Sequence, residues 1–158
     1  MIEKKELSEG KQKLLTLEKE GKVVFHGSPT PDLEELEPRQ GHTVPKGRKD
    51  LIKDGDPAIS ATPYAEIAIF RALIRKGTSD FSAYKNGKLG FRANREALDA
   101  AEERGYVYVL ERGNFSSRTS DPSHMEWRSK ERVRPIDVVV VQTGDLPKEI
   151  EILKEPQY

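Results

Sequence analysis

The segment Lys22-Val-Val-Phe-His-Gly-Ser-Pro29 decides how the rest of the chain is interpreted. Residues 22–25 are a short apolar run rich in β-branched side chains, bounded by glycines and followed by Ser-Pro, which predicts a strand that ends in a turn. His26 would therefore lie at a strand end, beside a glycine that lets a ligand come close. This arrangement is typical of a binding corner, but a half-exposed histidine that only ends an edge strand explains the same residues.

Length and charge limit the folds and partners that are possible. At 158 residues the chain is long enough for one domain and short for two, so we expect a surface helix in residues 1–21 and a single domain in residues 22–158. The 27 basic and 27 acidic side chains cancel, which argues against general electrostatic capture of nucleic acid or of an anionic membrane. The chain has no cysteine, which excludes disulfides, a thiolate nucleophile and a cysteine-based zinc site.

The distribution of apolar residues also bears on where the protein resides. No apolar run approaches the roughly 20 residues that a membrane-spanning helix needs. The first five residues are largely charged and lack the apolar core of a signal peptide. We therefore expect a cytoplasmic protein with no membrane partner.

Two or three helices are predicted from apolar spacing and from helix caps. The leucines of residues 8–20 predict a surface helix that packs by one narrow edge and stops at a glycine. Residues 63–76 are apolar over most of a helical circumference and follow Thr62, a capping residue, so they should form the most buried helix. Asn94 would cap a third helix that continues to residue 104.

About six strands are predicted from β-branched and aromatic runs. Besides the first, they cover residues 58–62, the two arms of a hairpin around Asn86-Gly87 in residues 80–92, and residues 106–110, 126–129 and 136–143. In residues 106–110 the two tyrosines and the leucine would share one face and the two valines the other. Residues 136–143 are the longest β-branched run and would form a central strand.

The order of these elements indicates the fold class. Strands and helices do not alternate regularly, and no glycine-rich phosphate loop joins a strand to a helix, so the pattern predicts an α+β domain and not a doubly wound sheet. Residues 39–56 and 111–125 have no apolar period and are predicted to be long loops, a kind of segment that often carries function.

Three pieces of the sequence together resemble the ADP-ribosyltransferase superfamily. Its members have a histidine at the end of the first strand, a second strand that ends in small and hydroxyl residues before a helix with an aromatic, and a glutamate on a later strand. The corresponding pieces are Phe25-His26-Gly27-Ser28, Ile59-Ser60-Ala61-Thr62-Pro63-Tyr64 and Met125-Glu126-Trp127. The resemblance covers residues 23–141, fits the histidine-tyrosine-glutamate class best, and extends more distantly to the RNA 2′-phosphotransferases. It implies an ADP-ribosyltransferase-like fold with two small packed mixed sheets and flanking helices.

The resemblance also implies a binding site for NAD, used as a substrate. Glu126 would be the catalytic acid residue, since a carboxylate beside the nicotinamide ribose stabilises the positive charge that builds there as the glycosidic bond breaks. His26, the second residue with a catalytic role, would anchor the adenosine-side ribose. The residues implied to bind NAD are His26, Gly27, Ser28, Ser60, Thr62 and Tyr64.

Most of these residues also have a purely structural interpretation. Glu126 would be a surface carboxylate if it only paired with Arg128 or Lys130. Tyr64 would only pack if it belongs to the buried helix. Arg39 and the other basic residues of its loop fit a solvated surface as well as a contact with pyrophosphate.

A metal cofactor is not expected. His124-Met125-Glu126 has the His-x-Glu pattern of zinc deaminases, but that chemistry needs cysteines to complete the zinc site, and the chain has none. The remaining histidines, His26 and His42, do not have the spacing of a metal-binding helix or turn.

The function that follows from the resemblance is an NAD-binding ADP-ribosyltransferase-like enzyme. It would cleave the nicotinamide–ribose bond and transfer ADP-ribose to a macromolecular acceptor, either a protein or a nucleic acid. Two alternatives stay open from the sequence: an NAD-dependent RNA 2′-phosphotransferase-like enzyme, and a catalytically silent module on the same fold that binds a nucleotide or a protein.

Overall fold

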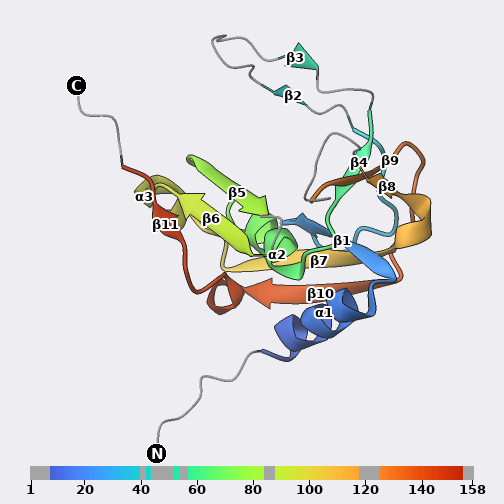
Figure 1. Cartoon of the computed structure of the whole chain (residues 1–158), viewed down its shortest axis with the longest axis horizontal. Helices are drawn as coiled ribbons and strands as arrows, with labels where there is room; N and C mark the ends of the chain where they lie inside the picture. Colours follow the sequence, from blue (N-terminus) through green and yellow to red (C-terminus); the bar gives the residue numbers. More distant parts are fainter. Residues whose placement is uncertain are drawn as a thin grey trace, which may run out of the picture.

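The computed structural model describes residues 8–39, 42–43, 52–53, 57–83, 88–117 and 125–154 (Figure 1). Within these ranges the protein is α+β, with small sheets that are mostly antiparallel and few helices. The helices are α1 (Glu9–Glu20), α2 (Ala65–Leu73) and α3 (Arg95–Asp99). The strands form three three-stranded sheets and one two-stranded ribbon, more than the two sheets expected.

The central sheet has the strand order β1-β7-β10, and both of its pairs are antiparallel. Its strands are β1 (Val23–Ser28), β7 (Arg104–Glu111) and β10 (Asp137–Gln142). The faces predicted for β7 are confirmed, because Val107 and Val109 belong to the core under the helices while Tyr108 and Leu110 belong to the core on the opposite side. β7 is buried on both faces because α2 packs against one of them and Leu36, Ile59 and Ala61 pack against the other.

β10 is an edge strand, so the prediction that residues 136–143 form a central strand is wrong. Val139 and Val141 are buried, whereas Val138 is 43% exposed and Val140 46% exposed. This alternation is typical of a strand covered on one face only. A continuous β-branched run therefore indicated a strand correctly but did not show how many of its faces are covered.

Two further sheets lie on either side of the central one (Figure 1). The first has the order β4-β9-β8 and is made of β4 (Ile59–Ala61), β9 (Trp127–Ser129) and β8 (Ser116–Ser117). The second has the order β11-β6-β5 and is made of β11 (Glu151–Ile152), β6 (Leu89–Ala93) and β5 (Ser79–Ala83). The hairpin arms predicted around Asn86-Gly87 are thus present as β5 and β6, while the turn itself lies outside the described residues.

Helix α2 is the most buried helix, as predicted, because it lies between two sheets. One of its faces, with Ala68 and Ala72, packs on the central sheet, and the other, with Ile67 and Phe70, packs on β6 and α3. The helix begins at Ala65 and not at residue 63, because Thr62 bridges β1 and the backbone of Tyr64 is still extended. It also ends three residues earlier than predicted.

Several other boundaries differ from the prediction. The third helix ends at Asp99 and does not reach residue 104, because residues 104 and 105 already pair with β10 at the start of β7. Asn94 caps this helix as expected, since its side chain accepts a hydrogen bond from the Ala97 amide. The predicted loop 39–56 contains the β2 (His42–Thr43) and β3 (Ile52–Lys53) ribbon, which projects from the rest of the chain (Figure 1). The predicted loop 111–125 contains the 3₁₀ turn Arg112–Asn114 and β8.

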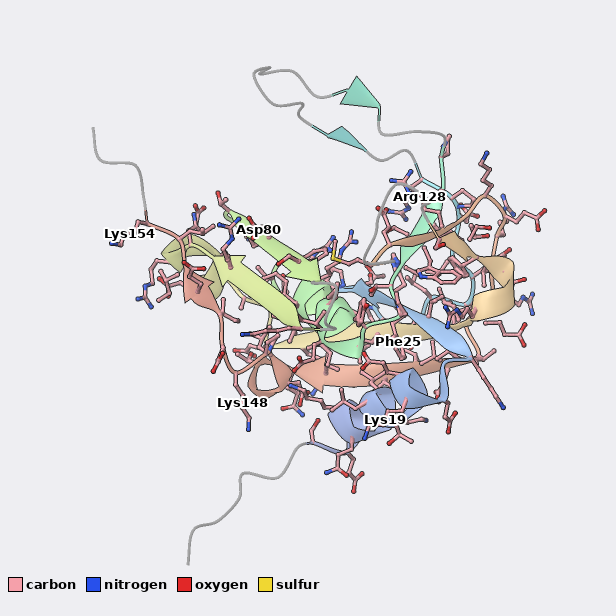
Figure 2. The ribbon with its side chains drawn as sticks, viewed as in Figure 1. Lys19, Phe25, Asp80, Arg128, Lys148 and Lys154 are labelled. Carbon is pink, nitrogen blue, oxygen red and sulfur yellow. The ribbon has the colours of Figure 1, made fainter. Side chains whose placement is uncertain are left out.

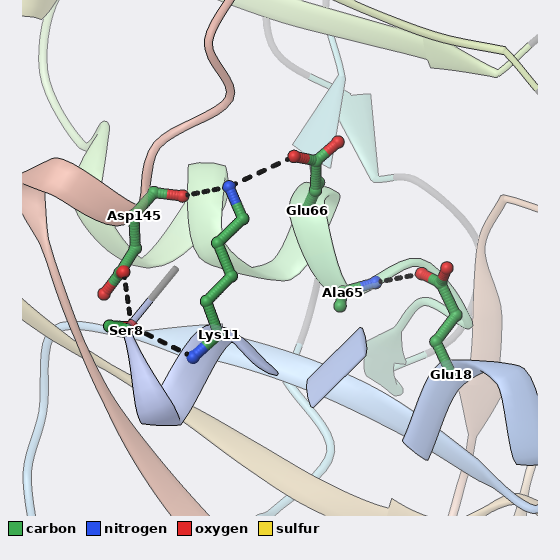
Figure 3. Close-up of polar contacts among 6 residues, drawn as sticks. All are labelled: Ser8, Lys11, Glu18, Ala65, Glu66 and Asp145. Atoms are coloured by element: carbon green, nitrogen blue, oxygen red, sulfur yellow. Dashed lines mark hydrogen bonds and ion pairs between the residues drawn. The ribbon is translucent and has the colours of Figure 1, made fainter. Parts of the chain in front are cut away.

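Helix α1 forms within the predicted residues 8–20, capped by Ser8 and stopped by Gly21 in the left-handed conformation. It is held against α2 by charged side chains (Figure 3). Lys11 is buried, and its Nζ lies 2.8 Å from the carbonyl oxygen of Asp145 and 3.2 Å from Oε1 of Glu66 on α2. At the other end of α1, the Glu18 carboxylate accepts a 2.6 Å hydrogen bond from the amide of Ala65, the first residue of α2.

Candidate active site

His26 lies inside β1 and not at its end, because the strand continues through Ser28 and pairs with β7 over its whole length. The imidazole is half-buried, and its Nδ1 lies 2.7 Å from the carbonyl oxygen of Ser60. Since a carbonyl oxygen only accepts hydrogen bonds, Nδ1 carries the hydrogen in this contact and Nε2 of the neutral ring is an acceptor.

The pKa of His26 is lowered, chiefly because burial disfavours the charged ring. The hydrogen bond to Ser60 acts in the opposite direction, and the positive charges of Arg71, Arg75 and Arg39 lower the pKa further. The imidazole is therefore neutral at pH 7.

Ser60 links His26 to Glu126. β4 is joined to β1 by two backbone hydrogen bonds between Thr62 and Phe25, of 2.7 and 2.9 Å, which places the preceding residues of β4 beside His26. While the Ser60 carbonyl accepts from His26, its hydroxyl donates a 3.1 Å hydrogen bond to Oε1 of Glu126. A single residue of β4 thus contacts both side chains that the sequence singled out as catalytic.

Glu126 is positioned by the pairing of β9 with β4. It directly precedes β9, whose Trp127 lies opposite Ala61. Its Oε1 accepts hydrogen bonds from Ser60 and, at 3.0 Å, from Nε of Arg128, a residue of β9 that is labelled in Figure 2. The ion pair with Arg128 that the sequence suggested is therefore present, but it is half-buried, since the Glu126 side chain is only 27% exposed. Ser60 connects it to His26, because Ser60 is hydrogen-bonded to both Glu126 and His26.

Arg71 of α2 lies beside this group. Desolvation by neighbouring atoms lowers the pKa of Arg71, although the residue as a whole is exposed, and the negative charge of Glu126 acts against this shift. Together with His26, Ser60 and Thr62, Arg71 lines a hollow of about 10 Å³. That is room for about one water molecule.

The other residues implied to bind NAD have local structural roles. A Cβ on Gly27 would lie 2.0 Å from the carbonyl oxygen of Ala68, so the close approach that this glycine permits is that of α2. The Ser28 hydroxyl is buried and accepts a bond from the amide two residues later, and Thr62 Oγ1 does the same for the amide of Tyr64. Tyr64 itself packs against the apolar core beneath β6.

Of the three arginines around His26, Arg71 and Arg75 are functional candidates that the sequence did not indicate, whereas Arg39 was already a candidate contact for pyrophosphate. Arg71 is the one basic residue of α2, a mostly apolar helix that also contains Glu66, and this is a weak signal in the sequence; Arg75 follows two residues after the helix ends at Leu73. Arg39 reaches the site because its backbone pairs with Ala58 at the start of β4, a long-range contact that local patterns do not predict.

No family model, curated protein or solved structure matches this chain. Within the described part of the chain, no group of three or more His, Cys, Asp or Glu side chains is arranged to hold a metal ion. His124 lies outside that part. No helix in the described ranges is long and apolar enough to cross a membrane.

Proposed function

We propose that the protein is an NAD-binding enzyme with an ADP-ribosyltransferase-like fold, which cleaves the nicotinamide–ribose bond and transfers ADP-ribose to a macromolecule. The observation that supports this proposal is the convergence of His26 and Glu126 on Ser60. These residues are 100 positions apart in the sequence. His26 belongs to the central sheet and Glu126 directly precedes β9 of another sheet, yet both are hydrogen-bonded to one residue.

The chemistry follows from the two side chains. As the bond to nicotinamide breaks, positive charge builds on the ribose, and the Glu126 carboxylate stabilises it. The bonds from Ser60 and Arg128 to Oε1 fix the orientation of this carboxylate before the substrate binds. His26, neutral and protonated on Nδ1, presents Nε2 as an acceptor for a ribose hydroxyl. Because the hollow between these groups holds only about one water molecule, the nucleotide would lie across its rim and not within it.

The test is the release of nicotinamide from NAD by the purified protein, with cell lysate and nucleic acid supplied as acceptors. Glu126→Gln keeps the size of the side chain and removes its charge, so turnover should fall by about 10² to 10³ while NAD binding persists. Glu131→Gln, an exposed carboxylate five residues away, is the matched control and should turn over normally. The proposal is wrong if the wild-type protein neither binds NAD nor releases nicotinamide with any acceptor.

A second candidate function is NAD-dependent removal of a 2′-phosphate from RNA. The observation that favours it is the presence of three arginines in electrostatic range of His26, since arginine suits the recognition of phosphate. An RNA oligonucleotide with an internal 2′-phosphate distinguishes the two activities. If the oligonucleotide loses that phosphate while NAD is consumed, the phosphotransferase is supported and the first proposal is wrong. Binding of NAD that Glu126→Gln leaves unchanged, without turnover by either protein, would indicate a silent binding module.

A further inference from the structure

A pocket beside the candidate active site is lined by two arginines. It has a volume of about 260 Å³ and lies between the C-terminal end of α2 and β5. Its lining residues are Phe70, Arg71, Ile74, Arg75, Ser79 and Phe81. It is therefore far larger than the hollow next to His26 and combines an apolar floor with two guanidinium groups.

The two arginines are held in place by contacts within the protein. The Arg71 guanidinium carbon lies 5.8 Å from the centre of the Phe81 ring, which is within the range of a cation–π interaction. Arg75 donates a 3.2 Å hydrogen bond from Nη1 to the carbonyl oxygen of Arg71. Both side chains are thus directed to the same end of α2, which reduces the entropy lost when they bind a ligand.

Arg71 connects this pocket to the candidate active site, since it also lines the hollow with His26 and Ser60. A ligand that contacts His26 would therefore need only to extend past Arg71 to enter the larger pocket. The positive charge around this path exceeds the negative charge. Among the described residues none of Arg39, Arg71 and Arg75 forms a salt bridge, and Glu126 is paired with Arg128.

We propose that Arg71 and Arg75 bind a phosphate group of a ribonucleotide whose ribose lies at His26. Arginine presents several N–H donors in one plane and matches phosphate oxygens in pairs, and Phe81 keeps the first of these planes in position. The inference rests on the proposed function for the placement of the ribose, but the phosphate site itself does not require any bond to be cleaved. The phosphate comes either from the diphosphate of NAD or from RNA.

The experiment measures binding of ADP-ribose, adenosine and inorganic pyrophosphate by calorimetry at low salt. None of these probes carries nicotinamide, so the result is independent of turnover. We expect wild-type protein to bind ADP-ribose at least about tenfold more tightly than adenosine, because a charge-assisted contact contributes about a tenfold factor or more. Arg71→Gln and Arg75→Gln should each weaken ADP-ribose and pyrophosphate by about tenfold and leave adenosine unchanged.

Arg95→Gln on α3 removes an exposed arginine away from the pocket and is the matched control. Arg75→Lys should be intermediate, since it keeps the charge and loses the planar donors. If Arg71→Gln and Arg75→Gln bind ADP-ribose and pyrophosphate as tightly as wild type while folded by circular dichroism, the phosphate site is wrong. If an RNA oligonucleotide shows the arginine dependence and ADP-ribose does not, the site stands and its phosphate comes from RNA. If ADP-ribose binding depends on the arginines but the protein releases no nicotinamide from NAD, the proposed transferase activity is wrong and the proposed phosphate site is supported.

Discussion

Replacing Gly27 with alanine would force β1 and α2 apart. The added Cβ would lie 2.0 Å from the carbonyl oxygen of Ala68 and 2.9 Å from the amide nitrogen of Ala72, and both neighbours are backbone atoms that cannot rotate away. The helix would have to withdraw by about 1.4 Å for the distance to the Ala68 oxygen to reach an ordinary contact of 3.4 Å. It cannot do so freely, because its opposite face packs on Phe91 and Ala93 of β6.

The magnitude follows from this geometry. Overpacking of a core usually costs about 1 to 3 kcal/mol, and a clash between two backbones belongs at the upper end. For a chain of 158 residues, a loss of about 3 kcal/mol lowers the melting temperature by roughly 6 to 12 °C. Urea and thermal unfolding, followed by circular dichroism, measure both quantities.

Gly113→Ala provides the control, since an added Cβ there meets no atom within 4 Å and should change stability by less than about 0.5 kcal/mol. If Gly27→Ala were as stable as wild type, α2 would not lie on β1 as described. The same variant also separates two roles of the glycine. If the only role of Gly27 were to let a nucleotide come close, Gly27→Ala would have normal stability and weakened NAD binding, which is the opposite of our expectation.

Two further predictions concern charged groups. Lys11→Met keeps the length of a side chain that is 5% exposed but removes its contacts with Asp145 and Glu66, so it should lower the free energy of unfolding by about 2 kcal/mol. The control is Lys13→Met, at an exposed lysine, which should change the free energy of unfolding by less than about 1 kcal/mol. Equal losses in the two variants would show that the buried contacts of Lys11 add no stability beyond those of an exposed lysine. The lowered pKa of His26 means that below pH about 6.5 the unfolded chain takes up a proton that the folded chain does not, so stability should fall as the pH falls from there. His26→Gln should flatten this part of a plot of unfolding free energy against pH, and an unchanged slope would contradict the burial of the ring.

The parts of the fold that were predictable from sequence are those with local signals. The end of α1 at Gly21, the cap at Asn94 and the alternation in residues 106–110 depend on neighbouring residues, and all three were predicted. The edge position of β10, the end of α3 and the pairing of β11 with β6 depend on which strands meet, and this is decided by long-range packing.

The candidate site divides in the same way. His26, Ser60 and Glu126 were predicted from a resemblance in order and spacing. In the structure the Ser60 carbonyl contacts the His26 ring and the Ser60 hydroxyl contacts the Glu126 carboxylate. That Arg71 and Arg39 both lie near His26 was not predictable, although Arg39 was already a candidate contact for pyrophosphate, because an arginine on a mostly apolar helix and another in a loop carry no sign of a shared neighbour. Only the packing of α2 across β1 and the bridge to Ala58 reveal it.

The attachment of α1 has a practical consequence for how this protein should be cloned. A shortened version starting at residue 22 would keep the whole region that resembles the superfamily, but it would leave the first amide of α2 without the Glu18 carboxylate and uncover the side of the core that Leu14 seals. Fusion partners and purification tags therefore belong ahead of Ser8. A trimmed version that proves insoluble would say nothing about whether the intact chain is an enzyme.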